Sequence, residues 1–317
     1  MALARHSAAK SDRSAPSTVT AGTVSARPRG GALACGLVTA RIGLGLAALG
    51  RPGYLNVGHG AELGDDRSVA ALRARTFEVL DFAYAAGVRD FDVARSYGRG
   101  EAFLGEWLRA HNPSGVHVSS KWGYVYTAGW EVAHDPPEVK HHDLATFRRQ
   151  LAETRENLGE WLQLYQIHSA TPDSGVLRDD AVLTAMQETD LPLGVSVSGT
   201  SQAETIDSAL TLGLFDAVQA TWNLLERAAE PALRRAHAAG VRVYVKEALA
   251  NGRLADRDAA ALAAALAQPW ATVVLSGAAS VDVLRSNLRA RDSAPAELGP
   301  AEDSAAYWAH RATLSWN

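Results

Sequence analysis

The sequence predicts an α/β protein, a single-domain (β/α)8 TIM barrel. Short runs rich in Val, Ile and Leu alternate with amphipathic segments over residues 41–290, as expected of repeated βα units and a parallel sheet. The apolar runs are nearly unbroken, which is typical of strands covered on both faces. Eight such runs can be counted, and eight strands are the number that closes a barrel of this kind.

The expected elements follow one another in a regular order. Strands are predicted at residues 41–45, 89–94, 116–121, 162–168, 191–198, 215–223, 241–248 and 271–277. Helices are predicted at residues 68–87, 100–111, 144–159, 180–189, 203–213, 231–240, 258–268 and 281–290. Four of these helices end at a glycine suited to a left-handed cap, namely Gly87, Gly159, Gly213 and Gly240.

A doubly wound sheet is the alternative architecture for alternating strands and helices. A dinucleotide-binding domain of that type carries G-x-G-x-x-G between its first strand and helix. Here Gly43, Gly45 and Gly50 have a different spacing and lead into a long polar segment. The glycine spacing therefore favours the barrel.

The N-terminal region has a composition unlike that of the remainder. Residues 1–36 are rich in Ser, Ala, Thr, Arg and Gly, which predicts a disordered extension before a barrel domain at 37–317. A transit peptide is an alternative for this segment on composition alone, whereas an export signal would need a continuous apolar stretch. Cys35 is the single cysteine, which suits a reducing compartment, so we expect a cytoplasmic protein.

Charge and hydropathy exclude several classes of partner. The formal net charge is -4, and no basic stretch indicates nucleic-acid binding. No apolar run approaches the roughly 20 residues of a membrane span. His134, His141 and His142 lack a cysteine or a suitably spaced carboxylate, so no metal is expected. A small molecule is the expected partner, and monomer and homo-oligomer both remain open.

Four polar residues lie at or near the ends of predicted strands. Asp92 and Tyr97 follow the second strand, Lys121 ends the third, and His168 ends the fourth. The loops after the strands of a barrel open onto one face, so these side chains should converge in one pocket. A carboxylate, a phenol, an ammonium and an imidazole in one pocket are suited to proton transfer.

The sequence around these residues resembles the aldo-keto reductase superfamily from about residue 40 to about residue 290. The resemblance is carried, in order, by FDVARSYGRGEAFLGEWL, SSKWG, LYQIHS, SVSGTSQ, QATWNLLE and LSGAASVDVLRSNLRA. Each fragment is a weak signal, but their order on an eightfold βα pattern makes chance agreement improbable. The resemblance implies an N-terminal hairpin ahead of the barrel and an NAD(P)(H)-dependent hydride transfer to an aldehyde or ketone, or from the corresponding alcohol.

The resemblance implies a role for each of the four residues. Tyr97 would donate the proton, and Lys121 would favour its phenolate by charge. Asp92 would keep Lys121 charged, and neutral His168 would orient the carbonyl. Taken one at a time, these residues have structural alternatives. Asp92 could be a loop or helix-capping residue and Tyr97 a half-buried aromatic. Lys121 could be a strand-end charge that reaches solvent, and His168 a hydrogen-bonded structural histidine.

The cofactor positions match the family incompletely. Ser198 and Gln219 match contacts to the nicotinamide carboxamide, but Gly199 stands where relatives have Asn. Lys246 occupies the place of a tyrosine that stacks on the nicotinamide, so Trp222 or another aromatic would have to replace that ring. Lys246 could instead approach a cofactor phosphate or pair with Glu247. Backbone contacts to the pyrophosphate are expected at Leu249 and Asn251.

The last βα unit offers an anion site, because a helix start presents unpaired backbone amides. The expected contacts with the cofactor here are Gly277, Ala278, Ser280, Arg285 and Asn287, together with Gly45 after the first strand. NADP(H) is favoured by family habit and NAD(H) is possible. Arg285 could substitute for the basic residues that contact the 2′-phosphate in relatives, or it could be a solvated helix residue.

The substrate side is expected in the long segment 122–142, since loops of this length are often functional. Trp122, Tyr124, Tyr126 and Trp130 would form an aromatic wall with Trp222, or would pin the loop to the barrel. Tyr307, Trp308 and Trp316 would close over the substrate or pack outside the barrel. Two rival functions share the same residues: a nicotinamide-binding sensor with little turnover, and a lyase that uses Lys121 as a Schiff-base nucleophile.

Overall fold

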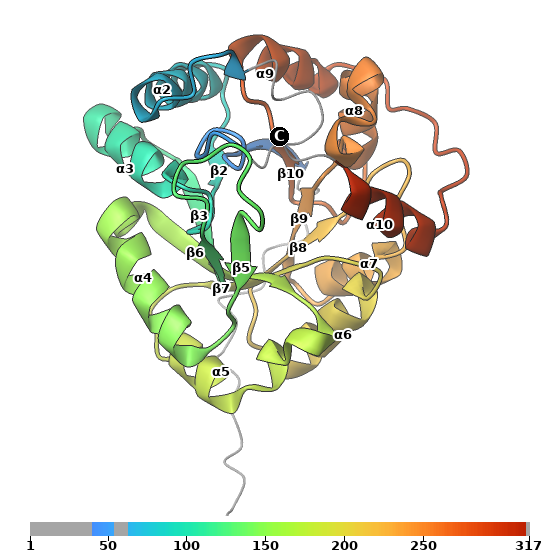
Figure 1. Cartoon of the computed structure of the whole chain (residues 1–317). Helices are drawn as coiled ribbons and strands as arrows, with labels where there is room; N and C mark the ends of the chain where they lie inside the picture. Colours follow the sequence, from blue (N-terminus) through green and yellow to red (C-terminus); the bar gives the residue numbers. More distant parts are fainter. Residues whose placement is uncertain (1–39, 54–62, 315–317) are drawn as a thin grey trace, which may run out of the picture.

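The computed structural model describes residues 40–53 and 63–314, and it shows a closed barrel of eight parallel strands (Figure 1). The strand order around the barrel is β1-β10-β9-β8-β7-β6-β3-β2. The bounds are β1 Arg41–Gly45, β2 Asp90–Asp92, β3 His117–Trp122, β6 Leu162–Ala170, β7 Leu193–Val197, β8 Ala217–Thr221, β9 Arg242–Lys246 and β10 Val273–Ser276. All eight predicted strands are present, and the barrel prediction is confirmed.

Helices alternate with these strands and surround the barrel (Figure 1). Eight of them correspond to the predicted segments: α2 Val69–Ala85, α3 Gly100–His111, α4 Leu144–Leu158, α5 Asp180–Gln187, α6 Gln202–Leu212, α7 Glu230–Ala238, α8 Asp258–Leu266 and α9 Val281–Leu288. A further helix, α10 Ser304–Thr313, follows in the C-terminal segment. The glycines expected at helix ends all have a positive φ, which is 82° at Gly87 and 66° at Gly213.

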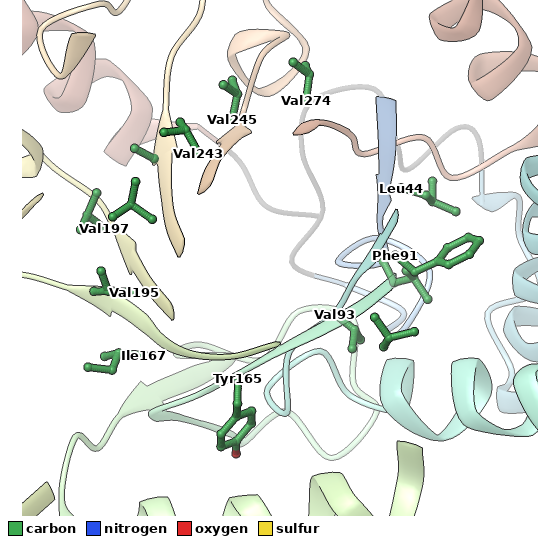
Figure 2. Close-up of a cluster of buried hydrophobic side chains, with 14 of the residues drawn as sticks. Leu44, Phe91, Val93, Tyr165, Ile167, Val195, Val197, Val243, Val245 and Val274 are labelled. Carbon is green, nitrogen blue, oxygen red and sulfur yellow. The ribbon is translucent and has the colours of Figure 1, made fainter. Parts of the chain in front are cut away.

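The barrel strands contribute to two separate hydrophobic clusters because side chains alternate across each strand. Val243 and Val245 of β9 belong to the large cluster between strands and helices, whereas Tyr244 belongs to a small cluster with Leu164, Ala217, Val273 and Leu275. Figure 2 shows Phe91 and Tyr165 pointing away from the strands toward the helices. Lys246, two residues after Tyr244, therefore projects to the barrel interior.

Two additions lie over the end of the barrel where the strands terminate (Figure 1). The loop after β3 contains an antiparallel pair, β4 Tyr124–Tyr126 and β5 Glu138–Lys140, where the sequence predicted only a long loop. Helix α10 is attached at the same end, since the Asn223 Nδ2 donates to the Tyr307 hydroxyl at 3.0 Å. The hairpin and α10 thus frame the carboxyl ends of the strands.

Several predictions fall outside the described residues. The disordered extension, the N-terminal hairpin, Cys35 and Trp316 all lie in segments 1–39 or 315–317. Within the described part of the chain, no helix has the length and apolar character needed to cross a bilayer. In the same ranges, no cluster of three or more His, Cys, Asp or Glu side chains has the arrangement of a metal site.

Candidate active site

Asp92 and Lys121 form a buried ion pair at the carboxyl ends of β2 and β3. The Lys121 Nζ donates to the Asp92 Oδ2 at 2.5 Å and to the Val93 carbonyl at 2.9 Å. The other carboxylate oxygen, Oδ1, accepts from the Ser119 hydroxyl at 2.6 Å and from the Gln219 Nε2 at 3.0 Å. Lys121 is 1% exposed, so its ammonium is fixed in place by these contacts.

Tyr97 lies beside this ion pair, in the turn between β2 and α3. The Lys121 Nζ is 5.1 Å from the centroid of the Tyr97 ring, and the His168 ring meets it edge-on with centroids 5.6 Å apart. The four residues predicted to converge are therefore brought together. Burial raises the pKa of the Tyr97 phenol, as does the Asp92 charge, while Arg51 lowers it. The expected lowering by Lys121 does not dominate, and Tyr97 retains its proton at neutral pH.

His168 is a neutral imidazole in this site. Burial lowers its pKa well below the ordinary value, and the positive charges of Lys121 and Lys246 lower it further. The Tyr124 ring lies edge-on to His168 with centroids 4.9 Å apart, and among the described residues no partner bonds the His168 Nδ1. A neutral ring can donate one hydrogen bond to a substrate oxygen.

Glycines allow the chain after β1 to pack directly against the turn that carries Tyr97. Gly98 has a φ of 56°, and a Cβ there would lie 2.5 Å from the Gly50 carbonyl oxygen. A Cβ on Gly50 would lie 2.2 Å from the Tyr97 carbonyl oxygen. The Arg99 amide donates to the Gly50 carbonyl at 2.7 Å. Gly50 is thus required by close approach to the catalytic turn.

A cavity of about 550 Å³ extends from Asp92, Tyr97 and His168 along β7 to β10 and α9. Asp92, Tyr97, Tyr124 and His168 line it at one end. The other predicted residues that line it are Gly45, Ser198, Gln219, Lys246, Leu249, Asn251, Gly277, Ala278 and Asn287. Nine of the eleven predicted cofactor positions therefore border the same cavity as the proton-transfer residues.

Lys246 faces this cavity beside an acid that is already bonded elsewhere. The Lys246 Nζ is 3.9 Å from the Glu247 carboxylate, which accepts from Arg311 at 2.6 Å and from Asn251 at 3.2 Å. Burial lowers the pKa of Lys246 to about 8, Glu247 opposes the shift, and Arg311 and Lys121 add to it. Burial alone would raise the pKa of Glu247, but Arg311 and Lys246 bring it to about 2.

Two predicted cofactor residues do not line the cavity. Ser280 caps α9, where its hydroxyl accepts from the Val283 amide at 3.3 Å. Arg285 donates to Asp282 at 2.5 Å, lies over the Phe82 ring, and has a side chain 59% exposed. In the described structure Ser280 stabilises the helix start and Arg285 is a solvent-exposed helix residue, and the cofactor contacts expected of both stay predictions.

Four of the predicted aromatic residues also lie away from the cavity. Trp122 and Trp222 are completely buried, and the Trp222 Nε1 donates to Glu230 at 3.1 Å. Neither can contact a substrate, and Trp222 cannot stack on a nicotinamide. The Trp130 Nε1 donates to the Arg67 carbonyl at 2.9 Å, and Tyr126 does not line the cavity. Trp130 thereby attaches the loop to the segment before α2, and Tyr124 alone of the five borders the cavity.

Several charged residues that line the cavity were not predicted from the sequence, and three of them lie near the predicted residues. Arg51 follows β1, Glu138 belongs to β5, and Arg311 belongs to α10. None of them lies at the carboxyl end of a barrel strand, where the active-site residues of this fold are expected. The sequence also gives no indication that Gly50 and Gly98 are in contact. Both the charged residues and this contact are revealed only by the fold.

The barrel and its site define a class of protein: an α/β barrel with a tyrosine and a histidine beside a buried lysine–aspartate pair. The model of the aldo/keto reductase family matches residues 41–263, which is more than half of the chain. The chain belongs to the aldo/keto reductase family.

Individual relatives agree with this assignment. The aldo-keto reductase str7 of Strobilurus tenacellus is 30% identical over 135 residues, which are 42% of this chain and 33% of that protein. The chain thus matches about a third of the length of that relative.

Solved structures show the same fold at low identity. A glycerol dehydrogenase from Gluconobacter oxydans is 20% identical, with a TM-score of 0.60 over 81% of this chain and 88% of that one. An aldo/keto reductase from Klebsiella pneumoniae, solved with NADP and acetate, is 18% identical, with a TM-score of 0.56 over 83% of this chain and 93% of that one.

Proposed function

We propose that this protein is an NADP(H)-dependent carbonyl reductase that transfers a hydride between the nicotinamide and an aldehyde or ketone, with Tyr97 as proton donor. NAD(H) is the second candidate cofactor. The proposal is carried by one observation: Asp92, Tyr97 and His168 line one end of a long cavity, and the buried Lys121 is paired with Asp92 behind them. The reducing compartment indicated by the single cysteine, Cys35, favours action in the cytoplasm.

The residues along the cavity are chemically suited to a dinucleotide. The Asn287 Oδ1 is buried without a partner in the described structure, and its Nδ2 donates to the Ser276 hydroxyl at 2.8 Å. Gly277 and Ala278 line the cavity just before α9, where backbone amides suit an anion such as a phosphate. A cofactor with a polar ring at each end and phosphates between them matches the distribution of polar groups along the cavity. The Klebsiella pneumoniae structure, which has the same fold, was solved with NADP.

Each catalytic side chain has a separate task. When bound, the nicotinamide supplies the hydride. Tyr97 gives its hydroxyl proton to the oxygen that becomes an alcohol, and its raised pKa keeps that proton available at neutral pH. Lys121 is held 5.1 Å from the Tyr97 ring centroid by Asp92, so its charge favours the resulting phenolate. His168 directs the carbonyl oxygen toward Tyr97.

Substrates are expected to enter beside Tyr124, because it is the aromatic residue of the β4–β5 hairpin that borders the cavity. The ring lies edge-on to His168, so an apolar or aromatic group of the substrate can pack there. The polar neighbours Glu138 and Ser169 also line this end, which suits a carbonyl compound that carries hydroxyl groups.

The proposal is tested by titrating the full-length protein with NADPH and with NADH and then screening aldehydes and ketones for NADPH oxidation. Binding of NADPH together with steady-state turnover is the expected result. Binding without turnover on any carbonyl would favour a sensor, for which the Lys246 substitution is the supporting observation. Absence of binding to either cofactor would refute the proposal.

A lyase acting through Lys121 is the second alternative, and the geometry disfavours it. The Lys121 ammonium is engaged by Asp92 at 2.5 Å and by the Val93 carbonyl, so its nitrogen lone pair is not available for attack. Borohydride added with carbonyl substrates should give no adduct at Lys121. A substrate-dependent adduct, located by mass spectrometry, would contradict hydride transfer.

A further inference from the structure

Arg51 lies over the ring of the proposed proton donor. Its Cζ is 4.9 Å from the centroid of the Tyr97 ring, a distance at which a guanidinium interacts favourably with an aromatic face. The side chain is only 3% exposed, and it lines the same cavity end as Tyr97 and His168. A nearly buried cation at this point needs a reason, because burial of charge is costly unless it is compensated.

The position of Arg51 is fixed by contacts from separate segments. Its Nη1 donates to the Glu138 Oε2 at 3.0 Å and to the Ser96 carbonyl at 3.4 Å. The preceding Gly50 packs against the Tyr97 turn so closely that a Cβ on Gly98 would also lie 3.0 Å from the Arg51 Cβ. The backbone of both loops therefore fixes the start of the Arg51 side chain, and Glu138 and the Ser96 carbonyl hold its guanidinium beside the phenol.

The charges around Tyr97 set its readiness to release a proton. Among the described residues, the acids that act on it are Asp92, Glu138 and Glu247, and each raises the pKa of the phenol together with burial. Arg51 acts in the opposite direction. The Lys121 ammonium lies 5.1 Å from the ring centroid, and the His168 imidazole is neutral.

We propose that Arg51 is a positioning residue for catalysis, which holds the Tyr97 ring and stabilises the phenolate formed when Tyr97 gives its proton to the substrate oxygen. The inference rests on the proposed function. In that step the O–H bond of Tyr97 breaks, the electron pair stays on the phenolate oxygen, and the proton joins the oxygen of the new alcohol. Water later returns a proton to Tyr97. In the reverse direction, the phenolate accepts the proton of the alcohol.

The ion pair between Arg51 and Glu138 connects the Arg51–Tyr97 contact to the substrate side of the cavity. Glu138 belongs to β5, which pairs with β4, and Tyr124 of β4 borders the cavity beside His168. The hairpin that carries the substrate wall is thereby anchored to the residue that covers the proton donor. A change in the hairpin should therefore alter the rate of proton transfer as well as substrate affinity.

The test compares Arg51→Met with a matched control, Arg89→Met. Arg89 lies over the Tyr84 ring at 4.0 Å, so the control removes the same kind of contact away from the cavity. Arg51→Met should lower kcat for carbonyl reduction and for alcohol oxidation by about 10- to 30-fold, as expected for a desolvated cation over an aromatic ring. The Kd for NADPH should stay within about twofold, and Arg89→Met should keep kcat within about twofold.

The pH dependence of kcat shows in which direction Arg51 changes the acidity of Tyr97. In alcohol oxidation, log kcat should rise with pH because the phenolate is the base, and Arg51→Met should displace this line toward higher pH by about one unit. Arg51→Lys should recover part of the loss, since it restores the charge. Glu138→Gln keeps an oxygen for Arg51 but removes an acid, so it should displace the line toward lower pH. A displacement toward higher pH in Glu138→Gln would overturn the inference.

A second readout does not require turnover. In protein labelled with 13Cζ-tyrosine, the signal lost in Tyr97→Phe should begin to move at a higher pH in Arg51→Met than in the wild type, and should be unchanged in Arg89→Met. An unchanged Tyr97 signal and an unchanged kcat in folded Arg51→Met would overturn the inference alone. A wild type without NADPH-dependent turnover would refute the proposed function, and the Tyr97 signal would still decide whether Arg51 acts on the phenol.

Discussion

The ion pair between Asp92 and Lys121 can be tested as a unit by a double-mutant cycle. Lys121→Met removes the ammonium but keeps much of its apolar stem, and it leaves a carboxylate 3% exposed without its counter-ion. Hydrogen bonds from Ser119, Gln166 and Gln219 would remain. Breaking a buried pair by removing one partner typically costs about 3–5 kcal/mol, and we expect a loss of that size in the free energy of unfolding.

Asp92→Asn is the complementary change, because it keeps the shape of the side chain and removes its charge. It leaves the Lys121 ammonium buried beside the Val93 carbonyl, so a similar loss is expected. The double variant has no uncompensated charge. Its loss should be smaller than the sum of the single losses by about 2 kcal/mol or more, which is within the range for residues in direct contact.

Urea unfolding followed by circular dichroism measures these differences, and NADPH oxidation is recorded on the same samples. All three variants should lose turnover, because two of them lack the Lys121 ammonium and Asp92→Asn lacks the carboxylate that holds Lys121 charged and in place. Additivity of the two single losses within about 0.5 kcal/mol would show that the residues do not interact, and would refute the reasoning from the 2.5 Å contact.

Three further predictions concern residues around the site. Burial lowers the pKa of His142 to about 4, below its ordinary value of 6.5. Up to about 3 kcal/mol in the free energy of unfolding should therefore be lost as pH falls from 6.5 to 4. Urea midpoints across this range should show the loss, and His142→Leu should reduce it. Gly123→Ala should destabilise the fold by about 1–3 kcal/mol, because the Cβ would lie 2.2 Å from the His142 ring at a φ of 111°; an unchanged melting temperature would count against it. Trp222→Phe should lower stability yet leave the Kd for NADPH within about twofold, since Trp222 is buried against Trp270; a large loss of affinity would restore it to the cofactor site.

The architecture could be predicted because each strand and helix carries its own local signal. Val243 and Val245 alternate with Tyr244 within a strand bounded by Gly240, and similar patterns recur eight times. The β4–β5 pair was missed because residues 124–126 and 138–140 are too short to stand out within a long polar segment. Short strands depend on tertiary partners more than on their own composition.

The proximity of Asp92, Tyr97, Lys121 and His168 could be predicted because strand ends of a barrel converge on one face. Arg51, Glu138 and Arg311 could not, since each reaches the cavity from a loop, a hairpin or a terminal helix whose path the sequence does not specify. Two aromatic residues show that a position at a strand end does not by itself place a side chain in the cavity. Trp122 and Trp222 are at or just after strand ends, as active-site residues are, yet their side chains point into the core. Alternation along the strand decides the direction of such residues, and one residue of register reverses it.

The most direct test of the central claim is Tyr97→Phe, which removes only the phenolic oxygen. The Tyr97 ring contacts to His168 and Arg51 can be kept by the phenylalanine, so the fold and the cavity should be preserved. We predict that kcat for carbonyl reduction falls by about 10²- to 10⁴-fold while the Kd for NADPH changes by less than about threefold. A folded Tyr97→Phe variant with wild-type turnover would contradict the assignment of Tyr97 as proton donor.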